Sequence, residues 1–304
     1  NAVIVRPRFD RYHEISQQIR AIFHLVTPLV EPLSLDEAYL DVTDVVTEDR
    51  TPEAIAREIK LRVKMDVGLT ISVGVATCKS VAKVASDFDK PDGLTVVPPG
   101  TEAAFFAPLP VGKLWGIGPK TAERLKLDGV NTIGQLADKS EAWFVQRFGK
   151  RGPEMRLMSL GLDDHPVSIE RESKSVSAET TLAEDVTELD DLRAIVRQQS
   201  ERVAGHLESS GLQGKTVTLK LRLSDFTTFT RRVTVAHPVS EAHQIDTVAQ
   251  TILEREIAPD RRFRLIGVGV SNFGEESDSP QLTLFGDDIE EQDEEPEPDE
   301  LSIE

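Results

Sequence analysis

The sequence carries at residues 34–39 the segment Ser34-Leu35-Asp36-Glu37-Ala38-Tyr39. The residues that follow, up to Thr43, favour a strand, so two adjacent carboxylates stand where a strand begins. Because successive side chains of a strand point to opposite faces, Asp36 and Glu37 converge on one ion only at a bend or bulge, which Pro32 favours. Carboxylate oxygens suit Mg²⁺, which binds one or two protein carboxylates and fills its other positions with water and phosphates. The alternative interpretation of this pair is a solvated turn.

Helices and strands alternate around this segment, which indicates an α/β or α+β region. Apolar residues recur with a helical period over residues 12–25. Thr51 as N-cap and Pro52 in the first turn predict a second helix. A buried strand is expected at residues 69–76, and a third helix at about residues 79–87.

The third helix carries Lys79 and Lys83, and Lys90 follows it. At ~100° per residue, offsets of 4 and 11 return to within ~40° of the starting direction, so the three ammonium groups form one stripe if the helix persists. The turn Pro91-Asp92-Gly93 would hold Lys90 at the helix end. A lysine stripe beside a magnesium site suits a triphosphate; the alternative is a solvated helix face.

Short helices with glycine-rich turns are expected from Pro108 to about Asp164. Within them, Trp115-Gly116-Ile117-Gly118-Pro119-Lys120 predicts a helix, a tight G-x-G hairpin and a helix. The glycines let the backbone approach a phosphate and present amide groups at a helix N-terminus. Such units bind the DNA backbone without reading its sequence. A plain helical hairpin is the alternative.

Residues 171–273 show the order β-α-β-β-α-β, with helices at about 188–209 and 240–257. The formal net charge of the whole chain is −18, which argues against a nucleic-acid-binding protein. However, 14 acidic residues and no Lys or Arg lie in residues 275–304, so the first 274 residues hold 39 acidic and 35 basic residues. A local basic groove therefore remains compatible with this composition.

The acidic tail, which we expect to be disordered, contains the apolar island Gln281-Leu282-Thr283-Leu284-Phe285. Such an island is typical of a short motif that becomes ordered in a partner's pocket, although a chance cluster is the alternative. No apolar run approaches the ~18 residues of a membrane span. The first residues resemble neither a signal peptide nor a natural start, and the lone Cys78 fits a reducing cytoplasm.

Taken together, these segments resemble the DNA polymerase IV type of the Y family of lesion-bypass polymerases, over about residues 1–273. The resemblance implies that Asp36 and Glu37 ligate the catalytic ions, two Mg²⁺ in the intact family. It also implies that Lys90 contacts the triphosphate of the incoming deoxynucleotide, with Lys83 and Lys79 on the same side. Residues 281–285 are similar to a peptide that binds a sliding clamp, of the bacterial β type or the PCNA type; its contact residues would be Gln281, Leu282, Leu284 and Phe285.

The resemblance also sets the expected architecture, an α+β multidomain chain. It comprises a partial palm at residues 1–107, a helix–hairpin–helix thumb at 108–168, a β-α-β-β-α-β little finger at 169–273 and a disordered tail at 274–304. The expected contacts to primer–template DNA are made by Gly116, Gly118, Lys120, Lys174, Arg231 and Arg232. Further candidates are Lys150, Arg151, Arg261, Arg262 and Arg264.

The implied function is low-fidelity translesion synthesis by a cytoplasmic monomer with no membrane association. The family begins with a strand that carries another metal-ligating Asp, followed by a fingers domain, and both would precede Asn1. We therefore expect negligible turnover from this chain alone. The alternative is a non-catalytic remnant that binds DNA and a clamp through residues 108–285.

Overall fold

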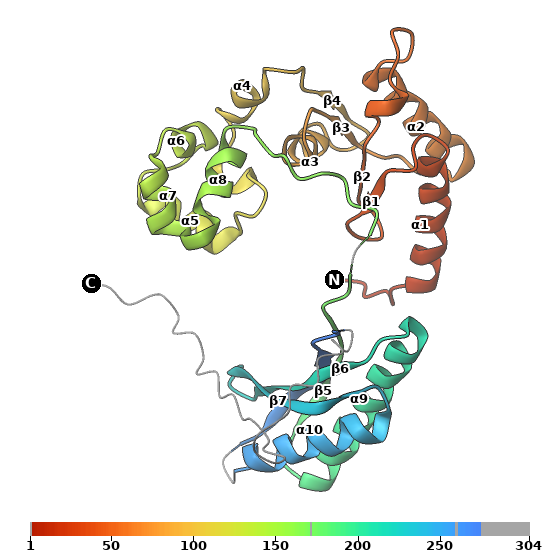
Figure 1. Ribbon diagram of the computed structural model, residues 1–304, viewed down its shortest axis with the longest axis vertical. Coiled ribbons are helices and arrows are strands. Elements are labelled where there is room, and N and C mark those ends of the chain that lie inside the picture. Colours follow the sequence, from red (N-terminus) through yellow and green to blue (C-terminus); the bar gives the residue numbers. More distant parts are fainter. Residues whose placement is uncertain (1, 171, 259–260, 275–304) are drawn as a thin grey trace. The chain divides into compact units, whose positions relative to one another are not determined.

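The computed structural model describes residues 2–170, 172–258 and 261–274 (Figure 1). The chain divides into two compact units, Asn1–Arg171 and Glu172–Glu304. The expected disordered tail, apart from residue 274, and the expected clamp-binding peptide 281–285 lie outside the described residues. Among the helices of the described part, none is long and apolar enough to cross a membrane.

The first unit opens with a long helix and a short hairpin. Helix α1 (Phe9–His24) precedes strands β1 (Val30–Pro32) and β2 (Ala38–Leu40), which pair antiparallel with Glu31 opposite Tyr39. A short 3-10 helix, η1 (Thr43–Val45), leads to α2 (Pro52–Asp66). The Thr51 hydroxyl accepts a hydrogen bond from the amide of Ala54, so the predicted cap is confirmed. Helices α1 and α2 share a core with Val26, which follows α1; its helical members are Ile22, Ile55, Ile59 and Val63.

A second pair of strands supports the lysine-bearing helix. Strand β3 (Val73–Val75) pairs parallel with β4 (Leu94–Val96), so the strand expected at 69–76 is only three residues long. Helix α3 (Lys79–Phe88) packs directly on β3. A Cβ on Gly74 would lie 2.1 Å from the carbonyl oxygen of Ala82 and 2.5 Å from the amide of Ser86. The close approach of strand and helix therefore depends on glycine at this position.

Short helices complete the first unit, as the glycine-rich turns predict. They are α4 (Glu102–Phe106), η2 (Val111–Lys113), α5 (Pro119–Leu127), α6 (Ile133–Ala137), α7 (Glu141–Phe148), η3 (Gly149–Arg151) and α8 (Gly152–Ser159). Their shared core includes Phe106, Leu125, Ile133 and Phe144, and it continues into α3 through Val81. The lysine-bearing helix is therefore packed on both β3 and this helical region.

The second unit has the predicted order β-α-β-β-α-β. Its elements are β5 (Ser175–Val186), α9 (Leu189–Ser210), β6 (Gly214–Leu223), β7 (Thr228–Val239), α10 (Ala242–Glu256) and β8 (Phe263–Ser271). The sheet order is β5-β8-β6-β7, with antiparallel pairing throughout. Helices α9 and α10 cover one face, as Figure 1 shows, and buried residues such as Val196, Leu207 and Ile252 pack against Leu219 and Val268. The other face of the sheet carries none of this core.

Candidate functional site

The adjacent carboxylates lie in the turn of the β1–β2 hairpin. The amides of Leu33 and Ser34 both donate to the carbonyl oxygen of Glu37, at 2.9 and 3.3 Å, which closes the turn. The Ser34 hydroxyl donates to the Asp36 carboxylate at 2.6 Å. Asp36 and Glu37 therefore lie at a bend that precedes the strand, which is the geometry that the paired-carboxylate hypothesis requires.

A chain of alternating charges runs from this turn to the end of α3. Lys83 Nζ donates to Glu37 Oε1 at 2.7 Å and to Asp87 Oδ2 at 3.4 Å, and Lys90 pairs with the other oxygen of Asp87. Burial alone would lower the pKa of Lys83, but the Glu37 and Asp87 carboxylates outweigh it and raise that pKa. Burial would raise the pKa of Asp87, but Lys90 and Lys83 lower it. The four side chains thus form the sequence Glu37, Lys83, Asp87, Lys90, with charges of alternating sign.

The three lysines do not form one helical stripe. Helix α3 ends at Phe88, so Lys90 lies beyond it, and Asp87 rather than helical continuity brings Lys90 close to Lys83. Lys79 pairs instead with Glu31 Oε2 at 2.8 Å and lies 5.5 Å from the ring centre of Tyr39. Lys83 and Lys90 therefore belong to one charge network, and Lys79 pairs with a different carboxylate.

The donor set at the turn fits a hard divalent cation. Asp36 is exposed and Glu37 is half-buried, so both carboxylates are accessible. Glu37 already forms an ion pair with the ammonium group of Lys83. Two carboxylates match the number that Mg²⁺ takes from protein when phosphates and water complete its shell. Within the described residues, neither side chain belongs to a group of three close metal-ligating side chains.

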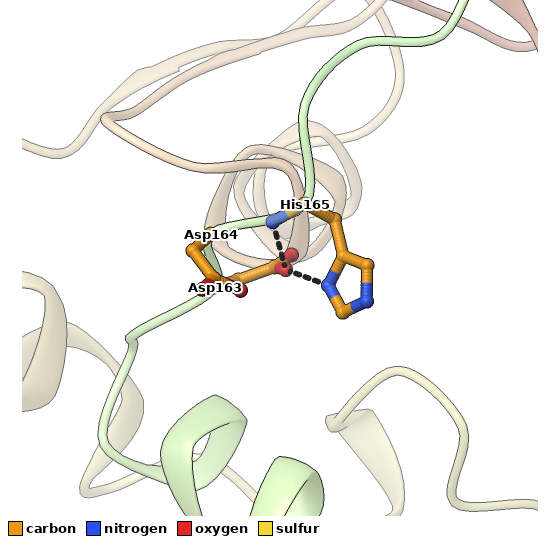
Figure 2. A group of neighbouring side chains, drawn as sticks. All are labelled: Asp163, Asp164 and His165. Carbon is orange, nitrogen blue, oxygen red and sulfur yellow. Dashed lines mark hydrogen bonds and ion pairs between the residues drawn. The ribbon is translucent and has the colours of Figure 1, made fainter.

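Such a group of three lies instead at Asp163, Asp164 and His165, whose ligand atoms are within 4.8 Å of one another (Figure 2). Asp163 accepts hydrogen bonds from the amide of Ser80 at 3.0 Å and from His165 Nδ1 at 2.7 Å. Burial would raise the pKa of Asp163, but the bonds from His165 and Ser80 lower it. The Asp163 carboxylate in turn raises the pKa of His165. Both oxygens of Asp163 are thus already engaged, one of them in capping α3.

The segment 161–168 forms further hydrogen bonds with residues between β1 and α3. The Cys78 thiol lies 3.4 Å from the carbonyl oxygen of Gly161, and the amide of Ser168 donates to Glu31 at 2.9 Å. Tyr39 is buried there, and its hydroxyl has no hydrogen-bond partner among the described residues. Burial, followed by the carboxylates of Asp163 and Glu31, raises the pKa of Tyr39.

The predicted hairpin forms a tight turn before α5. Gly116 has a φ of 87°, and the amide of Ile117 donates to the carbonyl oxygen of Leu114 at 3.1 Å. Gly118 is the N-cap of α5, and the next residues, Pro119 and Lys120, are exposed. The helix before the turn is the short 3-10 helix η2. The residues at the start of α5 are therefore exposed to solvent.

The sheet face without helices is polar and rich in small side chains. Val217, Leu219 and Leu221 point into the core, so the alternate residues of β6 lie on the open face. By the strand register, this face carries Thr218, Lys220, Arg222, Thr230, Arg232, Ser177, Glu179, Gly267 and Gly269. This set holds three cations, Lys220, Arg222 and Arg232, and one carboxylate, Glu179, which pairs with Lys220 at 2.8 Å.

Other arginines of the second unit form ion pairs with acidic side chains. Arg231 Nε donates to the buried Glu256 at 2.8 Å, and Arg261 pairs with the same carboxylate. Arg264 donates to Asp185 at 3.1 Å, and its guanidinium lies 4.8 Å from the ring centre of Phe226. Arg232 is exposed, as are Arg262 and Lys174, and so are Lys150 and Arg151 in the first unit.

Comparison with known proteins identifies the family of this chain. The impB/mucB/samB family model matches residues 1–87, the HHH motif of the same family matches 99–129, and its C-terminal domain matches 173–284. The DNA polymerase IV of Alkalilimnicola ehrlichii is 45% identical over 271 residues, which cover 89% of this chain and 76% of that protein. The chain belongs to the DNA polymerase IV group of the Y family.

Further comparisons agree with this membership. DNA polymerase IV 2 of Agrobacterium fabrum is 42% identical over 287 residues, covering 93% of this chain and 80% of its own length. A Y-family DNA polymerase chimera of Dbh and Dpo4 shares the fold, with a TM-score of 0.79 at 23% identity over 90% of this chain and 79% of its own. The predicted family and the α+β multidomain fold are confirmed, and DNA-directed DNA polymerase is the activity of this Y-family group.

Several residues around the candidate site were not predicted from the sequence. Asp87 lies one helical turn from Lys83, and an i, i+4 Lys–Asp pair could have indicated it. Glu31 and Asp163 act on residues 48 and 83 positions away, and no local pattern reports such a pairing.

Proposed function

We propose that this chain binds nucleotide and DNA as a translesion DNA polymerase, which performs low-fidelity, template-directed nucleotidyl transfer with two Mg²⁺ ions. The observation that carries the proposal is the charge network that links the Asp36–Glu37 turn to Lys90. It places carboxylates suited to a divalent cation and an ammonium group suited to a triphosphate in one connected set.

The residues of the network have distinct roles in this proposal. Asp36 and Glu37 hold the divalent cation, which neutralises charge on the reacting phosphates when bound. Lys90 leaves Asp87 for the triphosphate of the incoming deoxynucleotide. Lys83 and Lys79 contribute positive charge on the same side, and Lys79 does so while paired with Glu31.

The grip on primer–template DNA is assigned to two surfaces. The Gly116–Gly118 turn, with Lys120, presents backbone amides at the N-terminus of α5 to a phosphate. The open face of the sheet presents hydroxyl groups, glycines and the cations Arg222 and Arg232, and Lys174 precedes its first strand. Small polar groups and cations of this kind contact the DNA backbone without reading bases, as bypass of varied lesions requires.

The remaining assignments extend this proposal beyond the described residues. We expect a cytoplasmic monomer in which Gln281, Leu282, Leu284 and Phe285 bind a sliding clamp of the β or PCNA type. Deleting residues 281–285 should abolish capture by an immobilised clamp and leave duplex DNA binding unchanged. Equal clamp capture by the deletion variant would remove this part of the proposal.

The proposal is tested by DNA binding and by primer extension. The chain should bind primer–template duplexes of unrelated sequence with similar affinity. A plot of the logarithm of the binding constant against the logarithm of the salt concentration should steepen by roughly 0.9 for each phosphate that the protein neutralises. Two-metal transfer needs carboxylates that bridge both ions, and the turn supplies only Asp36 and Glu37. Mg²⁺-dependent primer extension should therefore be lost in Asp36→Asn/Glu37→Gln, whereas extension that survives in that variant, or a lack of duplex binding, would contradict the proposal.

A further inference from the structure

Lys83 is shared between two carboxylates that differ in their surroundings. Its ammonium group lies 2.7 Å from Glu37 Oε1 in the hairpin turn and 3.4 Å from Asp87 Oδ2 on its own helix. The Lys83 side chain is only 19% exposed, so bulk water can do little to replace either carboxylate as a partner of its ammonium group. Both carboxylates are therefore within reach of the Lys83 ammonium group from one backbone position.

We propose that Lys83 is a displaceable counter-ion of the cation site, and that Asp87 receives Lys83 when a divalent cation binds Glu37. This inference rests on the proposed function, because it assumes that Asp36 and Glu37 bind the cation. Lys83 would then be a positioning residue, which holds Glu37 toward the site while no cation is bound.

The physical reason is the competition of like charges for one carboxylate. An ammonium group that stayed within hydrogen-bond distance of Glu37 would repel a divalent cation on the same carboxylate, and the Lys83 side chain is largely shielded from water. Asp87 relieves this repulsion because it is already within reach of Lys83. Lys90 occupies the other oxygen of Asp87, so a triphosphate that draws Lys90 away leaves Asp87 free for Lys83.

The two partners of this exchange should have opposite effects on cation affinity. Lys83→Gln removes the competitor, so we expect tighter Mn²⁺ binding, by about three- to tenfold. Asp87→Asn removes the alternative position for Lys83, so we expect weaker binding by a similar factor. In the double variant, Asp87→Asn should have no further effect, because Lys83 is no longer present to be displaced.

The experiment is a Mn²⁺ titration of the full chain, followed by electron paramagnetic resonance of free Mn²⁺. The variant Asp36→Asn/Glu37→Gln defines the binding by other acidic groups, which is subtracted. Arg57→Gln is the matched control, because it also removes one positive charge from an i, i+4 ion pair, here with Glu53 on α2. Circular dichroism and thermal unfolding establish that each variant is folded.

The outcomes separate the inference from the proposed function on which it rests. Opposite effects of Lys83→Gln and Asp87→Asn, no effect of Arg57→Gln and no further effect of Asp87→Asn in the Lys83→Gln background would support the exchange, whereas a further loss of affinity in the double variant would reduce the effect of Asp87 to its charge and overturn the exchange. If the wild type binds Mn²⁺ through Asp36 and Glu37 but the two variants change affinity in the same direction, or not at all, only the exchange is overturned. If Asp36→Asn/Glu37→Gln binds Mn²⁺ like the wild type, the cation site and the exchange both fail.

Discussion

The carboxylate of Asp163 accepts a hydrogen bond from the amide of Ser80 at 3.0 Å, although 83 positions separate the two residues. Ser80 lies in the first turn of α3, where backbone amides have no partner within the helix. Asp163 therefore caps the helix that carries Lys83, and the cap is supplied by the segment that follows α8. A negative charge at this end of the helix is also favoured by the helix dipole.

The pH dependence of stability should report the Asp163–His165 pair. The pKa of His165 is raised, so its contribution is complete below its ordinary pKa of 6.5 and is lost as the pH rises through the raised value. The pKa of Asp163 is lowered, so its contribution is present above 3.8 and is lost as the pH falls through the lowered value. Thermal unfolding of His165→Ala should lose the alkaline decline and keep a smaller acid decline, because the His165 side chain supplies part of the interaction that lowers the pKa of Asp163. His243→Ala, in the other unit, is the control. If the unfolding temperature of His165→Ala still falls with rising pH as in the wild type, this assignment is contradicted.

Gln199 offers a stabilising substitution in the second unit. It is fully buried in α9, and neither its amide nitrogen nor its amide oxygen has a hydrogen-bond partner among the described residues. An unsatisfied buried polar group costs about 1–3 kcal/mol, and an apolar side chain of similar shape removes that cost. Gln199→Met should therefore raise the unfolding temperature in calorimetry. Gln244→Met, which removes the capping box of α10, should lower it. A lower unfolding temperature for Gln199→Met would show that the amide is satisfied in solution.

Alanine substitutions at Gly116 and Gly129 can distinguish an effect of backbone strain from an effect on DNA binding. Both have positive φ, at 87° and 78°, so an alanine at either position costs about 1–2 kcal/mol of stability. A Cβ on Gly116 lies in the hairpin, 3.3 Å from an Arg151 nitrogen, whereas a Cβ on Gly129 meets nothing within 4 Å. Gly116→Ala should weaken duplex binding in fluorescence anisotropy and Gly129→Ala should not. Equal loss of affinity would indicate that the hairpin has no special role.

Arg231 and Arg232 are neighbours on β7 with different expected roles. Arg232 is on the open face, whereas Arg231 is bonded to the buried Glu256. Arg232→Ala should reduce the log–log salt slope of duplex binding by about 0.9. Arg231→Ala should leave the slope unchanged and lower the unfolding temperature, because Glu256 loses one of its two arginines. The reverse pattern would assign the DNA contact to Arg231.

The elements that the sequence predicted well are those with local signals. The Thr51 cap, the two amphipathic helices of the second unit and the bend at Asp36 each depend on residues only a few positions apart. The strand at 69–76 was predicted too long, because its apolar run continues beyond the three residues that pair with β4. Periodicity measures apolar character, and the pairing partner decides where a strand ends.

The parts of the site that were not predicted depend on contacts between distant segments. The lysine stripe assumed a helix that continues to Lys90, but α3 ends at Phe88 and Asp87 connects the lysines instead. Asp163 and Glu31 have partners that only the folded chain brings close. The different positions of Arg231 and Arg232 follow from strand alternation, which the sequence alone could have supplied.

The absence of a side chain at Gly74 has a consequence for the comparison of related genes. Because β3 lies against the backbone of α3 there, even one added methyl group would push apart the strand and the helix that bears Lys83. A homologous gene that encodes a larger residue at this codon should also encode compensating changes in the helix, or a displaced lysine. The residue encoded at this position therefore indicates which homologous proteins keep the same spacing between Glu37 and Lys83.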